Sequence, residues 1–490
     1  MDLFVKLSML VIFFGVMIAV GLYCKKHSTD VSGFVLGGRK VGPWLTAFAY
    51  GTSYFSAVIF VGYAGQFGWK YGVAATWIGI ANALLGSLLA WAVLGRRTRV
   101  MTQHLDSATM PQFFASRYGS RGLKLAASAI IFVFLIPYTA SLYNGLSRLF
   151  EMAFHVDYAI CVIVMAVLTA VYVIAGGFMA TAVNDFIQGI IMLFGIVAVV
   201  AAVLAAQGGF SAAITDLAAV SDGTTTVPGV FASFFGPDPL GLIGVMILTS
   251  LGTWGLPQMV QKFYAIKSEQ ALSKGLVIST LFATVVAGGC YFLGGFGRLF
   301  SDRVDVAKAG YDAIVPAMLA GLPSILIALV VILVLSASMS TLSSLVLTSS
   351  STLTLDFVRG TVKKEMSEKQ SLLTMRVLIA VFIAVSAGIA IFQYRSGVAF
   401  IAQLMGISWG AMAGAFLAPF LYGLYWKKAS RAGCWVSFGF STVVMMANIL
   451  ARSIFPAFLQ SPINAGALCM LAGLVLTPLF SLLLPDKKDR

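Results

Sequence analysis

The sequence contains few charged residues, few histidines and few cysteines. Only 10% of its 490 residues are Asp, Glu, Lys or Arg, and it has 3 His and 5 Cys, whereas about 25% of an ordinary soluble domain is charged. This composition excludes a soluble globular protein. The scarcity of His and Cys also excludes a zinc cluster, a haem site and a disulfide framework. We therefore expect no organic cofactor, and we expect the isolated cysteines to pack as small apolar side chains.

Long hydrophobic runs are what the chain has instead. Hydrophobic residues make up 59% of it and the mean hydropathy is +0.95. A helix needs about 20 apolar residues to cross roughly 30 Å of hydrocarbon. We predict an all-α integral membrane protein with about 13 transmembrane helices, at residues 4–24, 43–68, 74–95, 124–149, 156–178, 180–206, 239–262, 271–296, 324–357, 371–394, 398–426, 432–454 and 464–484.

The net charge of +14 is explained by the loops between these spans. Most Lys and Arg residues fall on one side of the predicted topology, among them Lys25, Lys262 and Lys428. Because basic loops stay in the cytoplasm, we expect the N-terminus outside and the C-terminus inside a plasma or inner cell membrane. No basic patch is left for nucleic acid, and the expected partners are the lipid bilayer, a small-molecule substrate and an ion.

Two spans contain residues that interrupt helices. The run Phe48–Ala57 mixes glycine with hydroxyls, and the run Thr249–Gln258 holds two glycines and Pro257, which removes a helical donor. Counted from residue 43 they are the first and sixth spans, as in two inverted repeats of five helices. Close packing at glycines is the alternative. The predicted parts are an N-terminal helix and loop (1–42), a first repeat (43–206), an outer loop (207–238), a second repeat (239–426), and two C-terminal helices with a short tail (427–490).

Two polar features stand out within the spans. Asp185 lies in an otherwise apolar helix, where a charge costs a few kcal/mol, so it is a candidate functional residue; a hydrated carboxylate near the interface is the alternative. The span 324–357 is rich in Ser and Thr, and positions 337, 340, 341 and 344 share one helical face. Hydroxyls together with carbonyls freed by a broken helix suit a hard cation such as Na⁺. Hydroxyls that bond back to the preceding turn are the alternative.

Several segments, in this order, resemble the sodium:solute symporter family over residues 5 to 485. They are Phe34–Arg39, Ala108–Tyr118, Gly176–Gly189, Ala337–Ser344 and Gly406–Gly410. The resemblance implies the leucine-transporter-type fold, with a core of five-plus-five inverted repeats, one helix before it and two after.

The resemblance also implies ion sites. The principal sodium site would use the carbonyls of Thr52, Phe55 and Ala337 and the hydroxyls of Ser340 and Thr341. Some members of the family bind a second sodium, whose ligands here would be Asp185, Ser340, Ser343 and Ser344. Other members with similar residues use one ion, so one or two remain open. Sodium is the only metal implied, and it serves as the coupling ion.

The resemblance indicates the substrate less directly than the ion sites. Proline carriers have an acidic residue at the position of Tyr54, and the run Thr52–Ala57 looks more like the pantothenate and monocarboxylate branches. No Arg lies in mid-span to clamp a dianion. We expect a small carboxylated solute such as pantothenate or a monocarboxylate, or an amino acid such as proline. The candidate substrate-binding residues are Tyr54, Ser56, Tyr138, Trp254, Gln258 and Trp409.

The function expected is sodium-coupled import by alternating access, for which a monomer should suffice. A sodium-coupled sugar or sialic-acid symporter, and a non-transporting solute sensor on the same fold, are alternatives. A channel would need a continuous polar pore, whereas the hydroxyls gather at one helix. An enzyme is not expected, because no His, Cys or carboxylate pair lies in mid-span to act as acid and base.

Overall fold

The computed structural model describes residues 2–154, 156–221, 227–362, 365–396 and 401–486. Within these ranges the chain is helical and forms no β-strand, apart from an isolated bridge between Val41 and Ile266. This confirms the all-α class. The first residues of the predicted span 398–426 and part of the predicted loop 207–238 lie outside the described residues.

The helices follow one another with short connections. In the first half they are α1 (Asp2–Cys24), α2 (Val31–Leu36), α3 (Pro43–Tyr54), the π-helix η3 (Val58–Tyr63), α4 (Ala64–Tyr71), α5 (Thr76–Ala81), the π-helices η5 (Asn82–Leu89) and η6 (Trp91–Gly95), α6 (Arg96–His104), α7 (Met110–Tyr118), α8 (Arg121–Phe154), α9 (Tyr158–Ala206) and α10 (Phe210–Ala219). In the second half they are α11 (Pro239–Gly255), α12 (Pro257–Ala265), α13 (Glu269–Gly294), α14 (Val306–Ala309), α15 (Ile314–Leu319), α16 (Ser324–Thr352), the π-helix η10 (Leu353–Val362), α17 (Glu368–Ser396), α18 (Ile401–Tyr425), α19 (Arg431–Leu450) and α20 (Pro462–Leu483).

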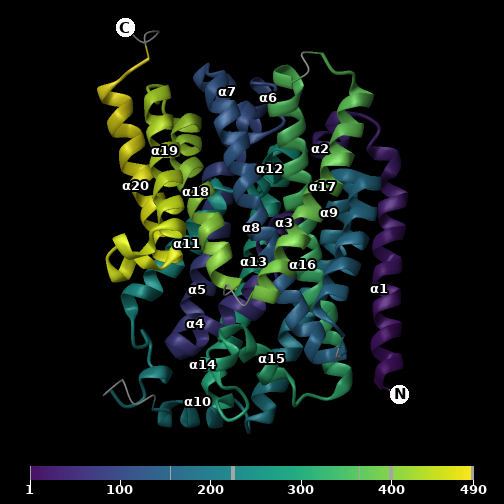
Figure 1. Ribbon diagram of the computed structural model, residues 1–490, viewed down its shortest axis with the longest axis vertical. Coiled ribbons are helices and arrows are strands. Elements are labelled where there is room, and N and C mark those ends of the chain that lie inside the picture. The colour runs from purple at the N-terminus through teal and green to yellow at the C-terminus, as the bar shows by residue number, and fades with distance from the viewer. Residues whose placement is uncertain (1, 155, 222–226, 363–364, 397–400, 487–490) are drawn as a thin grey trace.

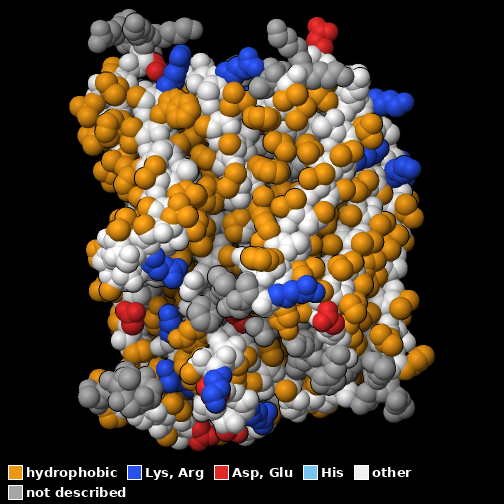
Figure 2. Space-filling model, in the orientation of Figure 1, with side chains coloured by type: hydrophobic (Ala, Val, Ile, Leu, Met, Phe, Trp, Pro, Cys, Tyr) orange, Lys and Arg blue, Asp and Glu red, His pale blue; other side chains and the backbone are white. Residues whose placement is uncertain are grey.

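The long helices stand side by side in one bundle (Figure 1). Hydrophobic side chains dominate the upper half of the face drawn in Figure 2, and charged side chains lie at its upper end, on its right edge and over its lower half. Ten helices of the described chain are long and apolar enough to cross a membrane, or up to eleven if the bent pair α11 and α12 forms one span. The predicted count of thirteen therefore stays a prediction. The start of α1 and the end of α20 lie at opposite ends of the bundle.

Helix α9 accounts for part of the difference in count. It has 49 residues, about 70 Å at 1.5 Å per residue, which is more than twice the hydrocarbon thickness. Gly177 interrupts it with φ 53° and ψ −144°, between two of the predicted spans. Both halves run beside α1, because Gly21 packs against Tyr172 and the Met17 carbonyl accepts a hydrogen bond from Asn184. The chain therefore turns back at Gly177.

Close helix crossings depend on glycine. A Cβ atom added to Gly68 of α4 would lie 1.9 Å from the carbonyl oxygen of Gly294 in α13. The two backbones touch there, as expected where small residues allow helices in a membrane to approach closely. This contact holds the first broken helix against α13.

Candidate ion and solute site

Both predicted helix interruptions are present. Helix α3 ends at Tyr54, Phe55 is extended (φ −94°, ψ 114°), and the chain becomes helical again before η3. Helices α11 and α12 meet at an angle of 45°, with Leu256 extended (ψ 123°) just before Pro257. Each break frees backbone groups from the helical hydrogen-bond pattern, so they can bind an ion or a solute.

Oxygen atoms from the first break converge on α16. The Thr341 hydroxyl lies within hydrogen-bond distance of three carbonyls, those of Thr52 at 3.0 Å, Phe55 at 3.2 Å and Ala337 at 3.1 Å, and can donate its one proton to any of them. The Ser340 hydroxyl likewise lies 3.1 Å from the Thr52 carbonyl and 3.0 Å from the Ala337 carbonyl, either of which can accept its proton. All five residues are buried, with at most 1% of their surface exposed. The structure thus brings the five expected sodium ligands together in one group, called the oxygen cluster below.

The oxygen cluster has the chemistry of a site for a small hard cation. It offers five neutral oxygens and no nitrogen or sulfur. Each hydroxyl keeps lone pairs that can face a cation when its proton points elsewhere. Thr52 in α3 and Phe55 just after it supply two of the carbonyls, and α16 supplies the other three oxygens. A cation here would therefore join the broken helix to α16.

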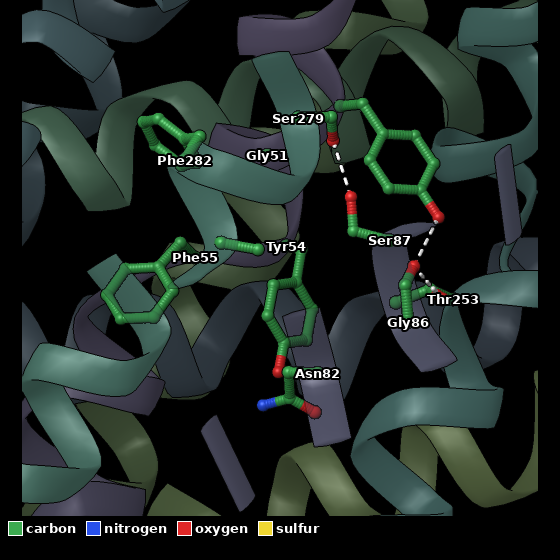
Figure 3. A pocket seen from close by; sticks show the side chains of 11 residues that line it. Gly51, Tyr54, Phe55, Asn82, Gly86, Ser87, Thr253, Ser279 and Phe282 are labelled. Carbon is green, nitrogen blue, oxygen red and sulfur yellow. Dashed lines mark hydrogen bonds between the residues drawn. The ribbon is translucent and has the colours of Figure 1, made fainter. Parts of the chain in front are cut away.

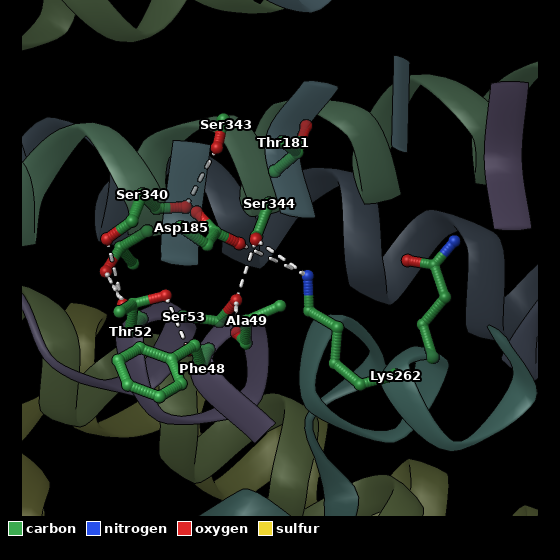
Figure 4. A network of polar contacts seen from close by, with 12 residues as sticks. Phe48, Ala49, Thr52, Ser53, Thr181, Asp185, Lys262, Ser340, Ser343 and Ser344 are labelled. Carbon is green, nitrogen blue, oxygen red and sulfur yellow. Dashed lines mark hydrogen bonds and ion pairs between the residues drawn. The ribbon is translucent and has the colours of Figure 1, made fainter. Parts of the chain in front are cut away.

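A polar network lies beside the oxygen cluster (Figure 4). The Lys262 ammonium in α12 donates to the Ser344 hydroxyl at 3.1 Å and lies 4.0 Å from a carboxylate oxygen of Asp185 in α9. Ser344 and Ser53 share a hydrogen bond of 2.7 Å, and the Ser343 hydroxyl donates to the Ser340 carbonyl at 2.9 Å. The network therefore joins four elements: α3, α9, α12 and α16.

Lys262 was placed wrongly by the sequence prediction. It was counted among the cytoplasmic loop residues, but only 3% of its side chain is exposed, and none of the Asp185 side chain is exposed. The burial of Asp185 also removes the alternative of a hydrated carboxylate. Removing one partner of such a buried pair costs about 3–5 kcal/mol, because it leaves an uncompensated charge. The signal for Lys262 was its place about two helical turns after the break at Leu256, at the end of the predicted span 239–262.

A small cavity lies beside the C-terminal end of α3 (Figure 3). Its volume is about 10 Å³, close to the minimum for one water molecule. Tyr54 lines it and points toward Asn82. Two serines across it, Ser87 and Ser279, share a hydrogen bond of 2.8 Å. A solute would have to move these side chains apart, so the structure is closed around this point.

The other predicted substrate residues divide into two groups. The Trp409 ring lies 5.6 Å from that of Tyr54 and 5.9 Å from that of Tyr138, measured between centroids, so these three are brought together. Trp254 instead donates to the Leu85 carbonyl at 2.9 Å. Ser56 accepts a hydrogen bond from the amide of Val58 at 3.2 Å and so caps the resumed helix.

Gln258 stands at the second break. It is 1% exposed, and within the described chain neither its amide nitrogen nor its amide oxygen has a hydrogen-bond partner. A buried polar group without a partner calls for an explanation such as a ligand. Its place in the first turn of α12, at the positive end of the helix dipole, favours an anionic or polar ligand group.

The sequence prediction missed the cavity residues of the neighbouring helices. Asn82 and Ser87 come from η5, and Ser279 comes from α13. Each is a polar residue in an apolar span, which was the available signal. Asn82 accepts a hydrogen bond from Ser250 at 3.0 Å, so the cavity wall is tied to the helix that precedes the second break.

Comparisons with known proteins agree with this geometry. The profile of the sodium:solute symporter family matches residues 34–439. Two curated relatives are named sodium/proline symporter, from Staphylococcus aureus strains NCTC 8325 / PS 47 and JH9. Each is 31% identical over 435 residues, which cover 87% of this chain and 82% of the relative.

Solved structures show the same fold. A Na⁺-coupled sialic acid symporter in its substrate-bound outward-open state matches with a TM-score of 0.76 at 18% identity, over 98% of both chains. A manganese transporter from Eremococcus coleocola matches with a TM-score of 0.52 at 12% identity, over 92% of this chain and 96% of that one. The leucine-transporter-type fold is confirmed. Fold and family are those of secondary transporters in membranes, not of enzymes.

Proposed function

Because the chain belongs to the sodium:solute symporter family, we propose that it is a sodium-coupled secondary active symporter that imports a small organic solute by alternating access. The observation that carries this proposal is the oxygen cluster, where two hydroxyls of α16 meet the carbonyls freed at the break after Tyr54. Sodium is the coupling ion, held by Thr52, Phe55, Ala337, Ser340 and Thr341. A second sodium at Asp185 stays a prediction.

Coupling follows from where the oxygen cluster lies. Phe55 contributes a carbonyl to it. Of its two neighbours, Tyr54 lines the cavity drawn in Figure 3 and Ser56 caps the resumed helix. A bound sodium fixes this unwound segment against α16 and so orders the residues that contact the solute. Each ligand then raises the affinity for the other by the same factor. Release of sodium into the cytoplasm loosens the segment and lets the solute leave.

The solute class is inferred from the cavity and the relatives. The residues that line the cavity carry no charge, which argues against a dianion. Tyr54, Tyr138 and Trp409 offer apolar faces, and Gln258 at the start of α12 offers an amide to a carboxylate. The sodium/proline symporter relatives favour an amino acid such as proline, and pantothenate or a monocarboxylate has the same single carboxylate. We propose that import runs toward the cytoplasm, where the C-terminus lies.

A solute screen tests this proposal. The purified protein is placed in proteoliposomes, and uptake of radiolabelled L-proline, pantothenate, lactate and sialic acid is measured with an inward gradient of sodium or of choline. We expect uptake of a solute with one carboxylate only with sodium. Sialic-acid uptake alone would favour the alternative substrate class, and equal uptake in sodium and choline would contradict sodium coupling.

A further inference from the structure

The carboxylate of Asp185 already has a cation beside it. The Lys262 ammonium lies 4.0 Å from it, donates to Ser344 at 3.1 Å, and stands 5.0 Å from the centre of the Phe178 ring. Only 3% of the Lys262 side chain is exposed and none of the Asp185 side chain. The lysine stem reaches in from α12, the inner half of the second broken helix, as Figure 4 shows.

The four residues expected to hold a second sodium are engaged elsewhere. The Ser340 hydroxyl belongs to the oxygen cluster, and the Ser343 hydroxyl donates to the Ser340 carbonyl. The remaining two, Asp185 and Ser344, face the Lys262 ammonium. The position between Asp185 and Ser344, called the Asp185–Ser344 pocket below, is therefore occupied by the Lys262 ammonium, a monovalent cation that the chain itself supplies.

Electrostatics oppose a further cation in this pocket. When both are ionised, Asp185 and Lys262 carry opposite unit charges and compensate each other. A sodium added next to the ammonium would leave a net positive charge in a buried place, where repulsion between like charges is strongest. Asp356, a second buried carboxylate, differs from Asp185: it accepts a hydrogen bond from the Thr109 hydroxyl at 2.6 Å, whereas the Asp185 oxygens accept none from the described residues.

We propose that the Lys262 ammonium is the resident cation of the Asp185–Ser344 pocket, in the place of a second sodium, so that the transporter binds a single sodium ion at the oxygen cluster. Lys262 is thus the residue that sets the ion stoichiometry. The proposal rests on the proposed function, because it takes the oxygen cluster as the sodium site.

Equilibrium binding of radiolabelled sodium to the purified, monodisperse protein tests it without any solute. We expect the native protein to bind one ion at saturation. Lys262→Gln removes the ammonium and should bind two, and adding Asp185→Asn to that variant should restore one. Lys267→Gln is the matched control, because Lys267 is an exposed lysine five positions after Lys262, and it should bind one.

Two results would overturn the proposal: two ions on the native protein, or one ion on a well-folded Lys262→Gln variant. If Lys262→Gln does not fold, Asp185→Asn alone decides. Because Asp185 faces the ammonium and not a sodium ion, the sodium affinity of the Asp185→Asn variant should stay close to that of the native protein. A fall of more than about tenfold would overturn the proposal. No sodium binding by the native protein would instead contradict the proposed function, so the two failures can be told apart.

Discussion

Replacing both Ser340 and Thr341 with alanine removes two of the five oxygens of the oxygen cluster. In the structure these hydroxyls make five contacts of 3.0 to 3.2 Å with the carbonyls of Thr52, Phe55 and Ala337. The substitutions leave the backbone carbonyls in place. The site should therefore keep its position and lose part of its affinity for sodium.

The size of the loss follows from the number of ligands removed. A hydrogen bond or contact to a charged group contributes about 1.5–3 kcal/mol, so even one lost ligand approaches or exceeds the 1.4 kcal/mol that corresponds to a factor of ten. The sodium concentration for half-maximal uptake should rise more than about tenfold. The carbonyls of Thr52 and Phe55 also lose a donor, which should lower the stability of the fold by about 1 kcal/mol per bond.

The assay is solute uptake into proteoliposomes at increasing external sodium. Ser338→Ala is the matched control, since Ser338 is buried on the same helix and its hydroxyl has no hydrogen-bond partner in the described chain. The control should keep the native sodium dependence. Unchanged sodium dependence in the double variant would refute the assignment of the oxygen cluster.

Three further predictions concern topology, solute binding and the fold. Single cysteines in place of Asp216 in α10 and Lys428 after α18, both exposed, should lie on opposite sides of the membrane of intact cells. The five native cysteines are buried and should not react, so an impermeant maleimide should label only position 216. Labelling of both positions would contradict the orientation. Gln258→Leu should raise the solute concentration for half-maximal uptake about tenfold or more, the loss of one hydrogen-bonding group, and native solute affinity would show that the amide does not face the solute. Gly177→Ala places a side chain on a residue with φ 53° and within 2.8 Å of Phe34. Thermal unfolding in detergent should show that the free energy of unfolding falls by at least about 1–2 kcal/mol, the cost of the left-handed conformation alone. Gly15→Ala, with open space around it, should unfold like the native protein, and equal stability of the two variants would contradict the turn at Gly177.

The helix breaks and the oxygen cluster could be predicted from sequence because both depend on local residue types. Glycine, proline and hydroxyls in mid-span are rare and have few explanations in a membrane. The expected ligands Thr52, Phe55 and Ala337 needed the family resemblance, since a carbonyl donor leaves no mark in the sequence. The structure places all three beside Ser340 and Thr341.

The position of Lys262 could not be predicted in the same way. A lysine after an apolar run normally ends a span, and the positive-inside rule assigns it to the cytoplasm. Its burial depends on the 45° bend between α11 and α12, after which the Lys262 side chain reaches Asp185 in α9 and Ser344 in α16. The contact with Asp185, 77 positions earlier in the chain, is a product of tertiary packing and has no pattern in the local sequence.

The count of spans shows a similar limit. Hydropathy separated 156–178 from 180–206, and the structure has the turn at Gly177 that such a division needs. Other predicted spans are built from several short helical pieces. The span 43–68, for example, consists of α3, η3 and α4, because the break that serves the site also shortens the helices around it.

The central claim is that sodium at the oxygen cluster is coupled to solute movement. It is tested most directly by letting a solute gradient drive sodium uptake, instead of letting a sodium gradient drive solute uptake. Proteoliposomes receive an inward gradient of the solute identified in the screen, with L-proline tried first, and equal sodium on both sides. Accumulation of radiolabelled sodium is then measured. The account predicts that the solute gradient drives sodium uptake above equilibrium and that the Ser340→Ala/Thr341→Ala variant does so far more weakly at the same sodium concentration. Solute entry without any sodium accumulation in the native protein would contradict it.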